Sequence, residues 1–261
     1  MLSARLAAWL EAGEAAAVIS VTGVQGSAPR DVGAAMAVTA RSFSGTIGGG
    51  ALEAQAIEAA RNLLLSEDHE AVLDQPLGPE IGQCCGGRVQ LSITVATPDL
   101  VGEIERTEAI KGAKQPTVLI FGAGHTGGAL ARALAPLPLN VSVIDERSDW
   151  LAPLSNAANC VQTALPEAEV AAAPSGAGFV IMTHDHALDF LIAEAALARG
   201  DAGYVGMIGS ASKRAKLTAD LARKDVASDT LVCPIGAGGS DDKRPEVIAA
   251  ATAAEITAAL L

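Results

Sequence analysis

The second half of the chain repeats one pattern, in which a short apolar run is followed by a longer amphipathic one. The continuous apolar runs at residues 118–121 and 179–182 are typical of strands that are buried on both faces. Strands that alternate with helices predict a parallel sheet with helices on both of its faces. The expected strands are 117–121, 141–144, 179–182, 204–208 and 231–235, and the expected helices are 126–135, 187–199, 211–223 and 245–260. We therefore expect a doubly wound, Rossmann-like α/β fold in this half.

The first half has a less regular pattern. It predicts helices at 2–12 and 51–65 and strands at 17–22, 35–40 and 89–94, the last from an alternating Val-x-Leu-x-Ile sequence. Because strands and helices are mixed unevenly, we expect a smaller α+β domain. The polar stretch Lys-Gly-Ala-Lys-Gln-Pro at 111–116 separates the halves. The predicted domains are therefore residues 1–113 and residues 114–261.

Composition and charge exclude several classes of protein. Half of the 261 residues are hydrophobic and the mean hydropathy is +0.33, which excludes a disordered chain. The chain has 18 basic and 30 acidic residues, so it lacks the basic excess of a nucleic-acid-binding protein. No apolar run approaches the ~20 residues that span a bilayer, and the first residues lack the apolar core of a secretory signal. We therefore expect a cytoplasmic protein with reduced cysteines and no membrane or nucleic-acid partner.

A dinucleotide-binding fingerprint follows the first strand of the second half. In Gly122-Ala-Gly-His-Thr-Gly127, Gly122 permits a tight turn, Gly124 lets a pyrophosphate approach, and Gly127 lets the helix pack on the strand. Asp145 ends the next strand, where a carboxylate binds a ribose hydroxyl and favours NAD-like over NADP-like ligands. The alternative is that these glycines only shape a turn in a fold that binds no nucleotide.

Two further loops follow later strands of the same sheet. His184, Asp185 and His186 come after the strand at 179–182, where a His-x-His pair could ligate a metal and Asp185 or Asp189 could add an oxygen ligand. We favour a polar loop in which His184 orients a ligand or caps the next helix. Ser210 and Lys213 follow the strand at 204–208 and form either an anion site or a capped helix with a solvated basic turn. The sequence does not decide between these two interpretations of the loop at Ser210 and Lys213.

Three loops of small residues mark the first half. The loop at 23–30 ends in Arg30, and Gly48, Gly49 and Gly50 directly precede a predicted helix. Consecutive glycines can form a nest of N–H groups that binds an anion, and Arg30 could add a bidentate cation. The third loop, Gly-Gln-Cys-Cys-Gly-Gly at 82–87, holds two adjacent thiols.

Cys84 and Cys85 have two interpretations. They could be small buried hydrophobic residues, or thiolates that act as nucleophiles or soft-metal ligands. The flanking glycines and the polar Gln83 favour functional use. Cys160 and Cys233 are expected in the core.

These motifs together resemble the xanthine dehydrogenase accessory protein (XdhC/CoxI) family over nearly the whole chain. The matching segments are GSAPR, GAAM, GTIGGGALE and GQCCGG in the first half, and IFGAGHTGGALA, VIDER, THDHALDF and YVGMIGSASKR in the second. The resemblance implies a chaperone that binds the molybdenum cofactor (molybdopterin), protects it during sulfuration by a cysteine desulfurase and inserts it into xanthine dehydrogenase. A homodimer without catalysis of its own is expected.

The resemblance also assigns roles to particular loops. Cys84 and Cys85 match the cysteine loop of the family, where a role in holding the cofactor is implied, with Cys85 as a contact on the molybdenum side. The chain departs from the family pattern at residues 234–242, where Pro-Ile-Gly-Ala-Gly-Gly-Ser-Asp-Asp is more acidic than the family's closing segment.

Two other functions are compatible with the motifs. An NAD-dependent oxidoreductase would use the fingerprint and Asp145, with a dinucleotide in the Rossmann-like domain. A redox or metabolite sensor would use the adjacent thiols. Against the oxidoreductase, no set of nucleophile, base and orienting group can be assembled from the sequence.

Overall fold

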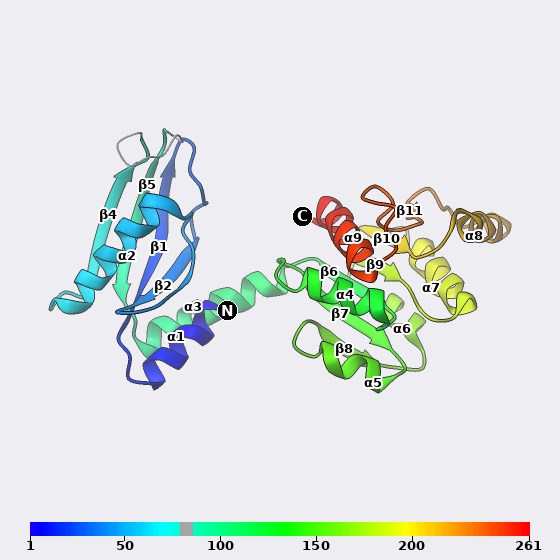
Figure 1. Ribbon diagram of the computed structural model, residues 1–261, viewed down its shortest axis with the longest axis horizontal. Coiled ribbons are helices and arrows are strands. Elements are labelled where there is room, and N and C mark those ends of the chain that lie inside the picture. Colours follow the sequence, from blue (N-terminus) through cyan, green and yellow to red (C-terminus); the bar gives the residue numbers. More distant parts are fainter. Residues whose placement is uncertain (79–85) are drawn as a thin grey trace. The chain divides into compact units, whose positions relative to one another are not determined.

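The computed structural model describes residues 1–78 and 86–261. The chain divides into two compact units, Met1–Lys111 and Gly112–Leu261, and each has its own sheet (Figure 1). The expected class, a doubly wound parallel sheet with a smaller α+β part before it, is confirmed. Within the described residues, no helix is long and apolar enough to cross a membrane.

The first unit is built on an antiparallel sheet whose described strands lie in the order β3-β2-β1-β5-β4. Its elements are α1 (Leu2–Glu11), β1 (Ala16–Gln25), β2 (Ala35–Thr39), β3 (Phe43–Gly45), α2 (Gly50–Leu65), β4 (Glu70–Pro76), β5 (Arg88–Val95) and α3 (Pro98–Ala113). The pattern had not predicted β3, β4 or α3. The polar stretch that was expected to separate the halves begins inside α3, which continues to Ala113.

Helices cover both faces of this sheet. Leu52, Ala56, Ala60 and Leu63 lie on one side of α2, at helical spacing, and belong to the core on one face of the sheet. The other face meets α1 and α3 in a smaller core around Leu6. Full burial of each large aliphatic side chain contributes roughly 1.5–3 kcal/mol, so the face covered by α2 dominates the stability of this unit.

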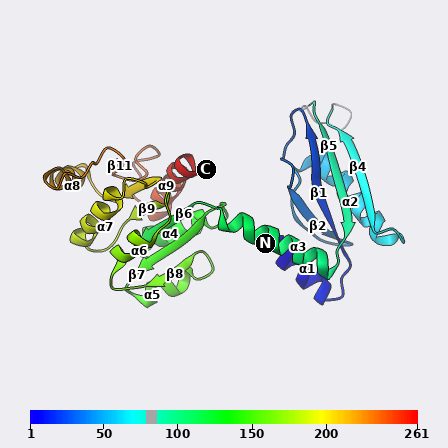
Figure 2. The ribbon, with the colours of Figure 1, turned by 180° about the vertical axis from the view of Figure 1, so that it is seen from behind.

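The second unit is a parallel sheet in the order β11-β10-β9-β6-β7-β8 (Figures 1 and 2). Its strands are β6 (Thr117–Phe121), β7 (Asn140–Asp145), β8 (Asn159–Gln162), β9 (Gly178–Ile181), β10 (Tyr204–Met207) and β11 (Leu231–Val232). Its helices are α4 (His125–Leu134), α5 (Ser148–Leu151), the 3-10 helix η2 (Ala152–Leu154), α6 (Pro166–Ala172), α7 (His186–Ala198), α8 (Ala211–Arg223) and α9 (Pro245–Leu260). The strand expected at 231–235 is only two residues long, and β8, α5 and α6 had not been predicted.

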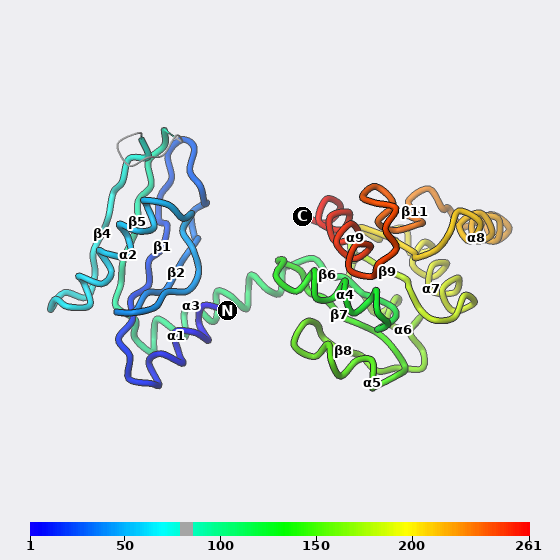
Figure 3. Tube along the Cα trace, viewed as in Figure 1, coloured from blue at the N-terminus to red at the C-terminus, as the bar shows by residue number. Residues whose placement is uncertain are grey.

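Burial on both faces explains the apolar strands of this unit. Along β6, Val118 and Ile120 belong to the core under α4 and α9, whereas Leu119 and Phe121 belong to the core under α6, α7 and α8. The trace in Figure 3 shows the chain running from each strand to a helix and back. Because β7 and β9 lie on opposite sides of β6, the strand order reverses there. In open α/β sheets, ligands bind at the carboxyl ends of the strands beside such a switch point.

Candidate ligand-binding site

The turn between β6 and α4 needs two of its three fingerprint glycines for its own packing. Gly122 has a φ of 113°, and a Cβ there would lie 2.3 Å from the carbonyl oxygen of Met182. A Cβ on Gly127 would lie 1.8 Å from the carbonyl oxygen of Gly122. These contacts are the tight turn and the close helix–strand packing that the sequence predicted. The protein's own backbone therefore accounts for both glycines.

Gly124 differs from the other two. Its φ is −60°, and a Cβ there would meet no protein atom within 4 Å. Gly124 is also the N-cap of α4, which has no side-chain cap, whereas Asp185 caps α7 and Ser210 caps α8. The start of α4 thus presents N–H groups and open space in the position predicted for a phosphate.

A pocket adjoins this turn at the carboxyl edge of the sheet. Leu188 of α7 and Ile144 of β7 give it apolar walls, and charged and polar groups surround its mouth. The lining residues are Phe121, Gly122, Ile144, Asp145, Glu146, Thr163, Ala164, Pro166, Thr183, His184 and Leu188. An apolar interior with a polar rim suits a flat heterocycle that carries polar substituents.

Asp145 lies at the end of β7, where it was predicted, and ties the turn to the neighbouring loop. Its Oδ2 accepts a hydrogen bond from the N–H of Ala123 at 2.8 Å, and its Oδ1 accepts one from the N–H of Arg147 at 3.0 Å. The Arg147 side chain donates to both oxygens, from Nε and Nη2, each at 2.8 Å. Burial by itself would raise the pKa of Asp145, but these hydrogen bonds lower the pKa to about 2, so the carboxyl is ionised at neutral pH.

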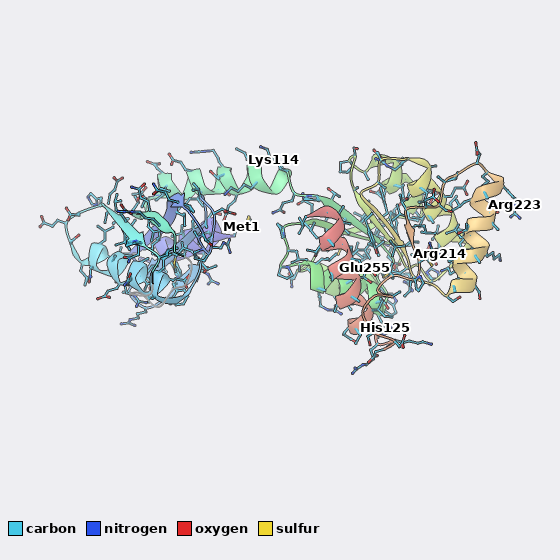
Figure 4. All side chains as sticks on the ribbon, turned by 90° about the horizontal axis from the view of Figure 1, so that it is seen from above. Met1, Lys114, His125, Arg214, Arg223 and Glu255 are labelled. Carbon is cyan, nitrogen blue, oxygen red and sulfur yellow. The ribbon has the colours of Figure 1, made fainter. Side chains whose placement is uncertain are left out.

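Arg147 was not singled out in the sequence. Its guanidinium carbon lies 5.1 Å from the centre of the Trp150 ring, and the Trp150 ring meets His125 edge-on with the ring centres 5.2 Å apart. His125, labelled in Figure 4, is the first residue of α4. A cation and two aromatic rings therefore lie beside the anion-binding turn. The available signal was the position of Arg147, two residues after the strand-ending aspartate.

The loop after β9 is ordered by its own side chains. Asp185 is the N-cap of α7 and accepts a hydrogen bond from the N–H of Ala187 at 2.7 Å. His184 lines the pocket, and its Nε2 lies 3.7 Å from Oε1 of Glu146 across the mouth. Within the residues that the structure describes, no three His, Cys, Asp or Glu side chains gather as a metal site. A ligand-orienting role for His184 stays a prediction.

The loop after β10 contains a buried ion pair. Lys213 donates to Oδ2 of Asp189 at 2.5 Å and to the carbonyl of Ile208 at 3.0 Å. Thr183 donates to Oδ1 of Asp189 through its N–H and its hydroxyl. Ser210 accepts a hydrogen bond from the N–H of Lys213. Of the two interpretations left open, the structure has the capped helix, but Lys213 is buried rather than solvated.

Asp189 of α7, which the sequence offered only as a further oxygen ligand for a metal, is the buried partner of Lys213. Its side chain is only 1% exposed, and it links the loops after β9 and β10. The signal was an aspartate inside an otherwise apolar stretch of α7, where an unpaired charge would be costly.

In the first unit, the three small-residue loops approach one another. The side chain of Pro29 occupies the space next to Gly48, and a Cβ on Gly48 would lie 2.6 Å from it. Ser27 of the 23–30 loop forms a backbone bridge with Gly86, which follows the two cysteines of the third loop. Arg30 is exposed beside these contacts. The structure therefore brings Arg30 and the 48–50 glycines together, as an anion site would require.

The glycine nest already holds a carboxylate. Oε2 of Glu53 accepts hydrogen bonds from the N–H groups of Ile47 and Gly49, both at 3.1 Å, and from the hydroxyl of Thr46 at 2.6 Å. This arrangement resembles the back-reaching half of a capping box. An external anion at this nest would compete with Glu53 for the same donors.

The structure describes two of the four cysteines, Cys160 and Cys233. Cys84 and Cys85 lie outside the described residues, so their roles stay predictions. Cys233 is buried and Cys160 packs against the core under α4 and α9. Burial raises the pKa of both thiols, which makes them poor nucleophiles.

The fold and this site define a two-part α/β protein whose Rossmann unit has a glycine-rich turn beside a pocket. The family model of the XdhC Rossmann domain matches residues 118–256, and that of the XdhC and CoxI family matches residues 9–74. The chain belongs to the XdhC and CoxI family.

One solved structure shares the fold over nearly the whole chain. A crystal structure described as a xanthine dehydrogenase from Bacillus halodurans superposes with a TM-score of 0.76 at 17% identity, covering 98% of this chain and 94% of that one. An imine reductase variant from Myxococcus stipitatus in complex with NAD+ gives a TM-score of 0.34 at 18% identity, covering 43% of this chain and 38% of that one. No curated protein sequence matches the chain significantly.

Proposed function

We propose that this protein is a molybdenum cofactor chaperone. It binds the cofactor, protects it during sulfuration by a cysteine desulfurase and inserts it into xanthine dehydrogenase. Membership of the XdhC and CoxI family supports an accessory role. The observation that supports cargo binding best is Gly124, because neither its φ nor any protein neighbour requires a glycine there. Such a glycine is expected where a ligand approaches the backbone.

The cofactor is a flat pterin with a phosphate and a dithiolene-bound molybdenum, and the Rossmann unit suits its organic part. The N–H groups at the start of α4 would bind the phosphate. The apolar walls at Ile144 and Leu188 would cover the pterin ring, and His184 at the mouth would donate to or accept from its polar edge. When bound, the cofactor supplies the redox-active metal of the enzyme that receives it.

The first unit carries candidate cofactor-binding groups of its own. Arg30 offers a cation beside the 48–50 glycines, and Cys85 stays the predicted contact on the molybdenum side. Each of these groups binds rather than reacts, which is what a carrier needs.

The pocket favours transfer over turnover. Its imidazole, His184, lies closest to the exposed Glu146, and its buried carboxylate, Asp145, is fully engaged by backbone and Arg147 donors. Among the described lining residues we find no nucleophile hydrogen-bonded to a base that a third group orients. We therefore place the protein with carriers, acting in the cytoplasm as a homodimer.

Reactivation of apo xanthine dehydrogenase tests this proposal. Cofactor-loaded protein is mixed with the apo enzyme, and recovered activity is compared with that from the same amount of free cofactor. We expect faster and fuller reactivation from the loaded protein. Gly124→Val places a branched side chain in the open space of the turn, so the affinity for the cofactor should fall at least ~tenfold, equivalent to ~1.4 kcal/mol. The exposed Arg132 of α4 provides the control variant Arg132→Ala.

Two results would contradict the proposal. Free cofactor could reactivate the enzyme as well as the loaded protein does. Alternatively, the protein alone could oxidise or reduce a substrate with NAD, in which case the oxidoreductase function would hold.

A further inference from the structure

We infer that Arg147 sets the ligand specificity of the Rossmann site by occupying the carboxylate that would otherwise bind a ribose diol. This inference rests on the proposed function, because it concerns the same site and names the class of ligand admitted there. The class is a phosphomonoester without a free ribose 2′,3′-diol.

The Asp145 carboxylate already has as many hydrogen-bond donors as it can accept. An ionised carboxylate offers about four lone-pair positions to donors. Asp145 receives four donors, which are the N–H groups of Ala123 and Arg147 and the Nε and Nη2 groups of the Arg147 side chain. In a dinucleotide site, the two ribose hydroxyls donate to this carboxylate. Here the two side-chain donors of Arg147 stand in their place, one on each oxygen.

Arg147 is held in place by both Asp145 and Trp150. The planar guanidinium binds the Asp145 carboxylate side-on, and its carbon lies 5.1 Å from the centre of the Trp150 ring. Trp150 in turn meets His125 of the turn. The Asp145 side chain is 4% exposed, so moving Arg147 away would leave a buried charge without its partner. A ribose diol must therefore displace a side chain that is held on both sides.

Part of the Arg147 guanidinium is exposed and can bind a ligand. A guanidinium has five N–H groups, and two of them donate to Asp145. The other three donate to no residue in the described part of the chain, and the side chain is 33% exposed. Fork-shaped donors of this kind bind phosphate oxygens, and an arginine near this position accommodates the 2′-phosphate in NADP-type sites. The exposed Glu146 lies near both His184 and Arg147. The hydrogen bonds to Asp145 and, to a lesser degree, the charge of Glu146 raise the pKa of the Arg147 guanidinium, which stays cationic.

The site therefore disfavours NAD and admits a phosphorylated ligand that has no free diol. A pterin monophosphate has no ribose and keeps its phosphate at the start of α4, whereas NADP carries a 2′-phosphate that the outward-facing donors of Arg147 can bind. Neither ligand has to displace Arg147 from Asp145. A nucleotide derivative of the cofactor that retained a free diol would be excluded.

Calorimetric titration of the full-length chain tests this inference. Arg147→Ala should bind NAD+ at least ~tenfold more tightly than the wild type, because the Asp145 carboxylate becomes available to the diol. The wild type should prefer NADP+ over NAD+, and Arg147→Ala should reverse that preference. In Asp145→Asn/Arg147→Ala the gain in NAD+ affinity should disappear, since the acceptor charge is lost. Arg132→Ala should behave as the wild type.

Arg147→Lys keeps the test valid if Arg147→Ala does not fold, because lysine retains the charge but cannot bind both oxygens side-on. An unchanged NAD+ affinity in a folded Arg147 variant, or wild-type binding of NAD+ as tight as that of NADP+, overturns the inference. Neither result affects the outcome of the reactivation assay, so the carrier function is tested independently of this inference. Comparing NADP+ with molybdopterin from a purified molybdoenzyme distinguishes a nucleotide phosphate from a pterin phosphate.

Discussion

Breaking the buried ion pair between Asp189 and Lys213 should strongly destabilise the second unit. The Asp189 side chain is 1% exposed and that of Lys213 is 11% exposed, with Nζ 2.5 Å from Oδ2. Lys213→Ala leaves Oδ2 without this partner, while Thr183 still donates to Oδ1. Removing one partner of a buried pair costs ~3–5 kcal/mol, because the other charge stays buried and uncompensated.

The expected loss can be measured in this unit alone. The chain has two tryptophans, Trp9 and Trp150, so Trp9→Phe leaves Trp150 as the fluorescent reporter of the second unit. For a unit of about 150 residues, each kcal/mol shifts Tm by ~2–4 °C, so Lys213→Ala should lower Tm by ~6–20 °C. Lys216, exposed on the same helix, gives the control Lys216→Ala, which should stay within ~0.5 kcal/mol of the parent.

A double-mutant cycle separates the ion pair from packing. In Asp189→Asn/Lys213→Met, neither charge remains, and the methionine fills most of the volume of the lysine stem. The cycle also includes the single variants Asp189→Asn and Lys213→Met. The double variant should lose less stability than the sum of these two single losses, and the difference is a coupling free energy of ~1–3 kcal/mol. A loss below ~1 kcal/mol for Lys213→Ala, or additive effects in the cycle, would refute the role assigned to this pair.

Four further outcomes follow from the site. The pKa of Asp145 is lowered from 3.8 to about 2, so its ionised form contributes roughly 2.5 kcal/mol to the free energy of unfolding. This contribution is present above pH ~4 and is lost as the pH falls through ~2. Asp145→Asn should remove this acid dependence in urea titrations. Gly127→Ala should abolish or strongly impair folding of the second unit because its Cβ would lie 1.8 Å from a carbonyl oxygen, whereas Gly124→Ala should cost no more than ~1 kcal/mol by thermal circular dichroism. Glu53→Ala should lower the stability of the first unit by ~1 kcal/mol, reported by Trp9 fluorescence, because two backbone N–H groups lose their acceptor. Cys85→Ala should reduce bound molybdenum cofactor with little change in the melting curve, and equal occupancy would exclude the thiol from cofactor binding.

The periodicity of the sequence predicted the central strands and the long helices of the second unit, but not β8, α5 or α6. The bounds of β6, α8 and α9 agree with the predicted ones to within a residue. Strands that are buried on both faces must be apolar at every position, so the sequence itself records that burial. Gly122 and Gly127 of the fingerprint were also predictable, because a positive φ at the first and a close backbone approach at the second exclude other residue types.

The edge strands were not predictable in the same way. β4 is the outer strand of its sheet, and its residues alternate between exposed and half-buried, with Glu70, Asp74 and Pro76 among them. An edge strand contributes little to the core and uses charges and proline against further pairing, so its composition is that of a loop. The apolar periodicity that reveals buried strands is therefore weak there.

The use of each charged group was decided only by the tertiary structure. The sequence places Asp145 at a strand end, but the fold makes Arg147 and the N–H of Ala123 its partners. The Gly49 N–H is similarly engaged by Glu53. Residue types determine which contacts are chemically allowed, whereas distances of a few ångströms between loops of different strands determine which contacts form. Electrostatic and hydrogen-bond energies depend steeply on those distances and on burial, so the roles of these side chains followed from the packing of the sheet and its helices.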